Sequence, residues 1–273
     1  MSPGRESRRE HWDRFWDAQP VEDVYEAVGA LHEELARHLD LNGARVLEVG
    51  AGSGRDSLAL AARGARVTVL DYSESALAAT RRALGRLRIE GPSPWLLRGN
   101  ALELPFADGS FDAVFHQGLL EHFRDPLPLL RENLRVLAAG GVLLVDVPQR
   151  WHPYTPAKRL LIALDRWFAG WECSFSAREL EHLLDGLGLE RICSYGAWPE
   201  PGLVYRVLRR AAGRLGLRLP MYPPPFPVLG QLANAFKRGQ RYRRLGQYTA
   251  MVVGVVARRP ATVTPSESKA RTA

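Results

Sequence analysis

Three glycines at alternate positions constrain this 273-residue chain more than any other feature of its sequence. Gly50, Gly52 and Gly54 follow an apolar run at residues 45–50 that predicts a buried strand, and residues 56–62 then indicate a helix. Glycine accepts positive φ and lets the backbone approach a ligand closely. A strand, a glycine-rich loop and a helix in this order predict a nucleotide-binding unit of an α/β sheet.

An acidic residue stands where such a unit needs one. Asp71 ends the next apolar run, at residues 65–70, and comes 21 residues after Gly50. A carboxylate at this spacing can accept hydrogen bonds from two ribose hydroxyls, so we expect an adenosine-containing ligand. A dinucleotide fits less well, because its pattern places a third glycine at the position of Arg55. An NAD-dependent oxidoreductase therefore stays only as an alternative.

Strands and helices alternate through the rest of the chain. Ser73 is expected to cap a helix, and Ser176 with Glu179 has the pattern of a capping box. The run Ala139-Gly140-Gly141 is expected to end a helix. Further strands are expected at 95–99, 113–116, 142–147, 189–195 and 248–258, and further helices at 74–88, 126–137 and from 177 onward. This alternation predicts the α/β class, with a doubly wound and mostly parallel sheet.

Three runs of residues together resemble one known family. They are Glu48-x-Gly50-x-Gly52-x-Gly54, LPFADGSFD at 104–112 and LLEH at 119–122. In these runs the chain resembles the class I S-adenosylmethionine-dependent methyltransferases, in the branch of ubiquinone, menaquinone and small-molecule methyltransferases. The resemblance implies a Rossmann-like sheet of seven strands whose last, antiparallel strand is the run at 248–258. It also implies S-adenosyl-L-methionine as the cofactor and S-adenosyl-L-homocysteine as the product.

The resemblance also implies which residues contact the cofactor. They belong to the loop after the first strand and to the ends of the next three strands: Glu48, Gly50, Ala51, Gly52, Gly54, Asp71, Tyr72, Asn100, Ala101, His116 and Gln117. Asn100 stands where the family usually has aspartate, and its side-chain carbonyl can still accept a hydrogen bond from the adenine amino group. His116 is expected to act as general base where the acceptor is a hydroxyl or an acidic carbon.

The chain divides into three expected parts. Residues 1–40 are expected to form a helical cap, residues 41–258 the methyltransferase domain and residues 259–273 a disordered tail. Two stretches interrupt the alternation, at about 149–174 and 197–246. Because both follow strands late in the sheet, and ligands bind beyond the carboxyl ends of such strands, we expect these insertions to cover the site as a lid.

The net charge of +7 is concentrated late in the chain. Residues 201–259 contain 12 lysines and arginines and no acidic residue. Such a segment either forms a membrane-surface helix pair for an amphiphilic acceptor, or binds phosphates of RNA or a metabolite, or is a solvated surface. Trp12, Phe15 and Trp16, with aromatic residues at 167–171, either line an apolar acceptor pocket or fix the insertion to the sheet.

Cysteine usage and apolar runs disfavour several classes of site and location. Cys173 and Cys193 have no metal-ligand neighbours in the sequence, so no metal site is expected, and two cysteines fit a reducing compartment. Residues 1–17 lack the apolar core of a secretion signal, and no apolar run reaches the roughly 20 residues of a membrane span. We therefore expect a cytoplasmic protein, with peripheral contact at the inner membrane surface through residues 201–244 as an alternative.

Two motifs of other methyltransferases are absent. The fourth strand is followed by His116-Gln117-Gly118-Leu119 rather than an Asn-Pro-Pro-Tyr type of motif, and no Pro-Cys pair follows the fourth or fifth strand. Methylation of nucleobase amines and of cytosine C5 is therefore disfavoured, and nucleic acid is not the expected partner.

The sequence predicts an S-adenosylmethionine-dependent methyltransferase that moves a methyl group to an O, N or C atom of a small or amphiphilic acceptor, including a lipid-linked one. The alternatives are a binding module with this fold or an RNA-directed methyltransferase that uses residues 201–244; acceptor and oligomeric state stay open.

Overall fold

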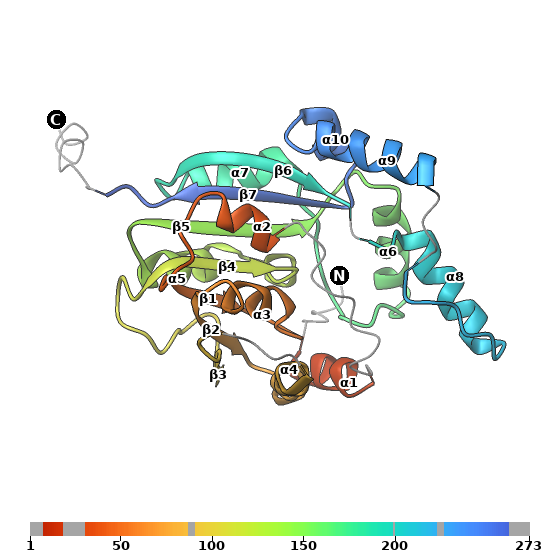
Figure 1. The fold of residues 1–273 in the computed structure, drawn as a ribbon, viewed down its shortest axis with the longest axis horizontal. Coiled ribbons are helices and arrows are strands. Elements are labelled where there is room, and N and C mark those ends of the chain that lie inside the picture. Colours follow the sequence, from red (N-terminus) through yellow and green to blue (C-terminus); the bar gives the residue numbers. More distant parts are fainter. Residues whose placement is uncertain (1–7, 19–30, 87–90, 199, 223–226, 262–273) are drawn as a thin grey trace.

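The computed structural model describes residues 8–18, 31–86, 91–198, 200–222 and 227–261. Its centre is a sheet of seven strands in the order β3-β2-β1-β4-β5-β7-β6 (Figure 1). The strands are β1 (Arg45–Val49), β2 (Arg66–Asp71), β3 (Trp95–Arg98), β4 (Phe111–Gln117), β5 (Leu137–Pro148), β6 (Glu190–Ala197) and β7 (Val252–Arg258).

The pairing of the strands is mostly parallel. β1 lies between β2 and β4 and is parallel to both, and the parallel order continues from β2 to β3 and from β4 to β5. β7 runs antiparallel to β5 and β6, between which it lies. Every residue of β1 except Arg45 is buried, as expected for a parallel strand covered on both faces. The predicted doubly wound sheet of seven strands with an antiparallel last strand is confirmed.

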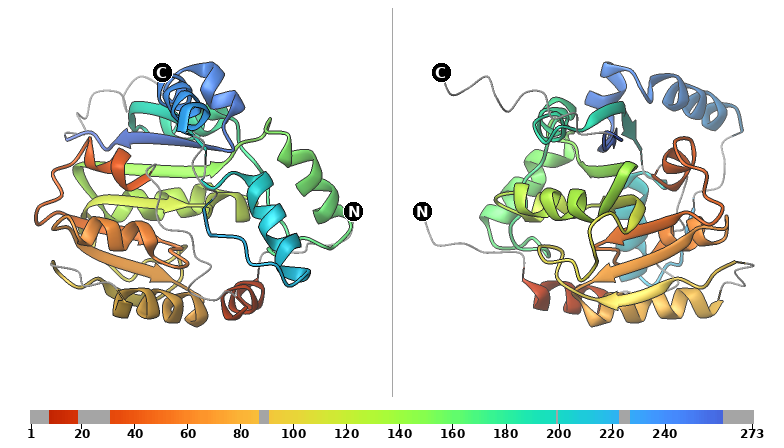
Figure 2. Two further views of the ribbon diagram at one scale, coloured as in Figure 1. Left: turned by 45° about the vertical axis from the view of Figure 1, so that its right-hand side comes forward. Right: turned by 90° about the vertical axis from the view of Figure 1, so that its left-hand side faces the viewer.

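Helices cover both faces of the sheet (Figure 2). On one face, Leu35, Leu60 and Leu77 pack with Phe115 of β4, and on the other face Leu130 and Leu184 pack with Val114. Since Val114 and Phe115 are neighbours on one strand, the alternation of side chains decides which helices each of them contacts. The helices are α1 (Arg9–Asp17), α2 (Leu31–Ala36), α3 (Arg55–Ala61), α4 (Glu74–Arg86), α5 (Leu127–Val136), α6 (Tyr154–Ala163), α7 (Ala177–Asp185), α8 (Leu203–Arg214), α9 (Pro227–Gln240) and α10 (Arg244–Thr249).

The caps of two helices agree with the sequence prediction. The Ser73 hydroxyl accepts a hydrogen bond from the Ala76 amide at the start of α4, at 3.1 Å. At the start of α7, Ser176 and Glu179 form the complete capping box, in which each side chain accepts from the other's backbone amide. Side-chain acceptors of this kind satisfy amides that have no partner within the helix.

Two predicted boundaries were wrong. α5 ends at Val136, and the glycines expected to end it lie inside β5, where the Gly140 amide donates to the carbonyl of Arg259 at 2.9 Å. Backbone pairing with the chain beyond β7 therefore outweighs the local turn preference of Ala139-Gly140-Gly141. The last strand begins at Val252, because residues 244–249 form α10.

The insertions contribute helices at one end of the sheet. Residues 149–174 contain α6, and residues 197–246 contain α8 and α9; in Figure 1 these helices lie beyond the carboxyl ends of β4 and β5. Within α6, the buried Lys158 forms an ion pair with Glu172 and donates to the Ser174 hydroxyl at 2.9 Å. These two contacts fix α6 to the last residues of the insertion at 149–174.

The ends of the chain are described only in part. α1 and α2 lie within the expected cap at residues 1–40, of which residues 1–7 and 19–30 lie outside the described residues. The tail expected at 259–273 also lies outside them from residue 262 onward. The division into cap, domain and tail therefore stays a prediction.

Within the described ranges, no helix combines the length and the apolar character that a membrane crossing requires.

The packing of β7 against β6 gives a test of the fold. A Cβ at Gly254 would overlap the ring of the fully buried Tyr195. We expect Gly254→Ala to lower the free energy of unfolding by about 1–3 kcal/mol, the usual cost of overpacking a core. Urea denaturation measures the change. Gly213→Ala in α8, where an added Cβ meets nothing within 4 Å, is the control and should not lose stability. Equal stability of Gly254→Ala and wild type would contradict the described packing.

Candidate active site

A cavity of about 540 Å³ opens at the carboxyl ends of the parallel strands. It lies where the strand order reverses between β1 and β4, which is the usual ligand position in open α/β sheets. Its volume is in the range of small-molecule sites, about 300–1,000 Å³. The lining residues come from α1, from the loops after β1, β2, β3 and β4, and from α8: Trp12, Phe15, Trp16, Glu48, Gly50, Ala51, Gly52, Ser53, Arg55, Asp56, Leu70, Asp71, Tyr72, Gly99, Asn100, Ala101, Leu102, Gln117, Gly118, Leu119, His122, Phe123, Arg206 and Arg210.

The glycine loop has the backbone that its sequence predicted. Gly50, Gly52 and Gly54 have φ values of +66°, +56° and +64°. A Cβ at Gly50 would come within 2.7 Å of Leu119, and one at Gly52 would overlap the indole of Trp16, so both positions require glycine. Gly54 does not line the cavity; it caps α3 and packs against Thr80 of α4.

Asp71 joins the ends of β1 and β2. Its Oδ2 accepts a hydrogen bond from the Gly52 amide and its Oδ1 accepts one from the Ser73 amide, both at 2.9 Å. Burial raises the pKa of Asp71, and these two amide hydrogen bonds oppose that shift. Each oxygen has a further lone pair, and the side chain lines the cavity, so the carboxylate can accept hydrogen bonds from a ligand there.

Glu48 lies on the floor of the cavity in a desolvated environment. Burial, with repulsion from Asp56, raises the pKa of Glu48 to about 8, so the side chain is mostly protonated at pH 7. The Ser57 hydroxyl of α3 donates to it and fixes its orientation. A cationic ligand group placed beside Glu48 would favour its ionised form.

Gln117 at the end of β4 is held from two sides. Its amide nitrogen donates to Asp146 at 3.1 Å, and its carbonyl oxygen accepts from Arg55 at 2.5 Å. Burial raises the pKa of Asp146 to about 7. Both contacts leave Gln117 at the cavity wall in one fixed orientation.

Asn100 is also fixed, because its side-chain carbonyl accepts a hydrogen bond from the Leu102 amide at 3.0 Å.

The structure places His116 away from the cavity in which most of the other expected site residues lie. Its side chain is fully buried on the face of β4 that Val114 occupies, and it does not line the cavity. Both ring nitrogens have no hydrogen-bond partner among the described residues, and burial lowers the pKa of His116 to about 3. The imidazole is therefore neutral and cannot reach an acceptor in the cavity, which is what a general base would have to do.

His122 lines the cavity instead, at the end of a 3₁₀ turn at Leu120–His122. Its ring packs edge-on against Trp12 with centroids 4.9 Å apart, and its Nδ1 has no hydrogen-bond partner among the described residues. Burial lowers the pKa of His122, and the nearby Glu172 only partly offsets this. The run LLEH at 119–122 was the sequence signal for this position, but it did not indicate that the histidine would face the cavity.

Some of the aromatic residues line the cavity, and others pack against those that do. Trp12, Phe15 and Trp16 of α1 line the cavity, whereas Phe168 stacks behind Phe15 with ring centroids 4.7 Å apart. The insertion at 149–174 therefore braces α1 against the site. Arg206 and Arg210 of α8 reach the cavity from the basic segment, a contact that charge composition alone did not predict.

The comparisons with known proteins agree with this geometry. Residues 47–145 match a family model described as a methyltransferase domain. A demethylmenaquinone methyltransferase of Clavibacter sepedonicus is 42% identical over 104 residues, which are 38% of this chain and 40% of that protein. A ubiquinone biosynthesis O-methyltransferase of Xanthomonas oryzae is 35% identical over 148 residues, which are 53% of this chain and 59% of that protein. This chain thus covers about half the length of these relatives.

Residues 47–145 therefore form a methyltransferase domain. Solved structures share its fold at low identity. The [4+2]-cyclase SpnF has a TM-score of 0.63 at 19% identity, covering 95% of this chain and 98% of that one. A geranyl diphosphate C-methyltransferase of Streptomyces coelicolor has a TM-score of 0.59 at 18% identity, covering 92% and 98%. Because one of the two is named as a cyclase, the shared fold does not by itself define the reaction.

The site of the methyltransferase domain fits its cofactor, S-adenosyl-L-methionine. Gly50, Ala51 and Gly52 line the cavity, Asp71 offers a carboxylate, and Asn100 and Ala101 line the end of the cavity beyond β3. Of the eleven cofactor-contact positions expected from the sequence, Gly54 and His116 do not line the cavity. The assignment of individual contacts stays a prediction.

Asp71 provides the test of cofactor binding. We expect Asp71→Ala to weaken binding of S-adenosylhomocysteine about 10- to 100-fold, because a hydrogen bond to a charged group contributes about 1.5–3 kcal/mol. Isothermal titration calorimetry measures the affinity. Asp108→Ala removes an exposed carboxylate that pairs with Arg135 away from the cavity, and should bind like wild type. Unchanged binding by Asp71→Ala would contradict its assignment.

Proposed function

We propose that this chain moves the methyl group of S-adenosylmethionine to an O, N or C atom of an amphiphilic acceptor that carries an anionic group. The observation that supports this acceptor is the composition of the part of the cavity wall that α1 and α8 form. Aromatic side chains of α1 face the cavity together with Arg206 and Arg210 of α8. An apolar wall favours the body of an amphiphile, and guanidinium groups bind phosphate or carboxylate.

The residues of the chain supply alignment and a dry environment for the transfer. S-adenosylmethionine supplies a methyl group activated by its positively charged sulfur. The acceptor atom forms a bond to the methyl carbon while the carbon–sulfur bond breaks and leaves its electron pair on sulfur. Asp71 and the loop at Gly52 would fix one reactant, and Trp12 and Phe15 would exclude water from the other.

His122 is the residue we propose as general base, in place of His116. It lines the cavity, and burial lowers its pKa, so the imidazole is neutral at pH 7 and has one unprotonated ring nitrogen. This role is needed where the acceptor is a hydroxyl or an acidic carbon, which releases a proton on methylation.

A substitution at His122 tests this role. We expect His122→Gln to lower the rate of methyl transfer by about 10²–10⁴-fold, with affinity for S-adenosylhomocysteine unchanged. Because the pKa of His122 is lowered, activity of the wild type should persist below pH 6.5 as the pH falls. His116→Gln is the matched control, and its rate per folded molecule should match wild type. A large loss for His116→Gln and none for His122→Gln would reverse the assignment.

The exposed part of α8 supports a lipid-linked acceptor. Its solvent face carries apolar side chains without a covering layer, and Val204 is 84% exposed. On the same helix the exposed arginines at 210 and 214 lie among Val207 and Leu208. Apolar and basic residues mixed on one helix are typical of binding in the interface of an anionic membrane. Two relatives named for menaquinone and ubiquinone biosynthesis support the same class of acceptor.

Residues 201–244 are therefore proposed to contact the inner membrane surface from the cytoplasm. RNA is less consistent with this face, because binding to phosphates would leave Val204 and Leu208 in water.

The double variant Val204→Asp/Leu208→Asp should reduce co-sedimentation with vesicles containing phosphatidylglycerol at least about fivefold, because it removes apolar area from the interface. Ile192→Asp, an exposed apolar position on β6, is the control and should bind like wild type. Equal loss in both variants would contradict a specific surface.

The acceptor class itself is tested by transfer of a labelled methyl group. Wild type and Asp71→Ala are incubated with labelled S-adenosylmethionine and a bacterial extract, and lipids, small molecules, proteins and nucleic acids are then separated. Label in the organic fraction above the Asp71→Ala level supports the proposal. Label in nucleic acid would favour the RNA-directed alternative. No label, with S-adenosylhomocysteine still bound, would indicate a binding module; binding of NAD(H) instead would favour an oxidoreductase.

A further inference from the structure

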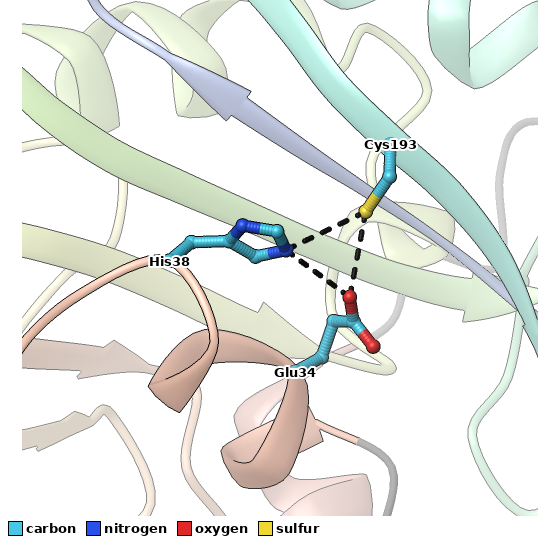
Figure 3. Close-up of side chains that lie close together, drawn as sticks. All are labelled: Glu34, His38 and Cys193. Carbon is cyan, nitrogen blue, oxygen red and sulfur yellow. Dashed lines mark hydrogen bonds and ion pairs between the residues drawn. The ribbon is translucent and has the colours of Figure 1, made fainter.

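Three side chains from distant parts of the chain converge on the face of the sheet covered by α2 (Figure 3). Glu34 lies on α2, His38 on the turn after it, and Cys193 on β6. Glu34 Oε1 is 3.2 Å from His38 Nε2 and 3.4 Å from Cys193 Sγ, and Nε2 and Sγ are 3.7 Å apart. None of the three lines the cavity.

The local structure explains why these atoms meet. Glu34 and His38 are four residues apart, a spacing that places side chains on one face of a helical turn. Cys193 and Tyr195 are alternate residues of β6, so their side chains lie on the same face of the sheet, the face that α2 covers. The convergence therefore depends on both elements and is fixed by their backbones.

The separations are those of ligands around a small tetrahedral ion. Zinc binds oxygen, nitrogen and sulfur at about 2.0–2.3 Å, so neighbouring ligand atoms at tetrahedral angles are about 3.3–3.6 Å apart. The three observed distances lie within about 0.2 Å of this range. A set with one thiolate, one imidazole and one carboxylate suits zinc, whereas magnesium and calcium prefer oxygen alone.

We propose that Glu34, His38 and Cys193 form a binding site for a zinc ion, with the fourth position open to water. The His38 side chain is 20% exposed, which gives the ion a path to the site. On binding, the Cys193 thiol releases its proton to solvent and the imidazole binds through Nε2.

The surroundings of Glu34 orient it for this role. Its other oxygen, Oε2, accepts from the Tyr242 hydroxyl at 2.7 Å and from Arg241 at 3.0 Å, and Arg37 lies 3.9 Å from it. The Tyr242 hydroxyl and the two arginine side chains therefore contact Oε2, whereas Oε1 is the oxygen that faces His38 and Cys193. Outer contacts of this kind fix a ligating carboxylate in metal sites. The ion would thereby join α2, β6 and the segment before α10.

Metal binding to the full-length chain tests the proposal directly. After treatment with a chelator, the protein is titrated with zinc in competition with a chromophoric indicator, and separately with cobalt(II). We expect one zinc per chain and, with cobalt, a thiolate-to-metal charge-transfer band. Cys193→Ser should lower zinc affinity more than about 100-fold, beyond the 10- to 100-fold usual for outer contacts, and remove the band. Cys173→Ser, which changes the other free cysteine, should retain both.

Further variants separate loss of the site from loss of folding. His38→Gln keeps the thiol and should weaken zinc binding to a similar extent, and Tyr242→Phe should weaken it about 10-fold through Glu34. Zinc should raise the melting temperature of wild type and Cys173→Ser but not of Cys193→Ser. Failure to bind zinc, or binding that Cys193→Ser and His38→Gln leave unchanged, would overturn the proposal and leave the three residues as a hydrogen-bonded cluster.

Discussion

The hydrogen bond from the Gly52 amide to the Asp71 carboxylate connects the two strands on which the site is built. It fixes the glycine loop after β1 to the end of β2, so that the loop cannot open without breaking a buried charge-assisted contact. The same carboxylate accepts from Ser73, whose hydroxyl caps α4 and also donates to Asp13 of α1 at 2.6 Å. One side chain thus connects the sheet, a covering helix and the helix that closes the cavity.

The residues that line the cavity form two walls. The strand ends and the glycine loop form a polar wall of backbone amides, carboxyl groups and a fixed glutamine. α1 and α8 form an aromatic and cationic wall, drawn from parts of the chain that lie outside the alternating strands and helices at residues 45–148. The first wall follows from the fold, whereas under the proposed function the second wall would select the acceptor.

This division explains how much the sequence predicted. The alternation of strands and helices, the positive φ of the glycines and the position of Asp71 follow from local sequence patterns. The seven strands and the antiparallel last strand were instead expected from the family resemblance. His116 was expected at the cavity but lies on the opposite face of β4 from Gln117, because a strand places neighbouring side chains on opposite sides and the motif did not indicate which side faces the cavity. Arg206 and Arg210 could not be placed, since their position depends on how α8 packs. Glu34 and Cys193 are 159 residues apart and show no spacing pattern, so only the folded chain brings them together.

The contact of Trp16 with Gly52 has an optical consequence. A ligand that approaches the Gly52 amide must share or replace the space that the indole occupies, and Trp12 lines the same cavity. Entry of a ligand therefore changes the polarity and solvation around two indoles at once. Intrinsic fluorescence of the unmodified protein consequently carries a signal from the cavity itself, so that exchange of ligands can be followed in real time without a label.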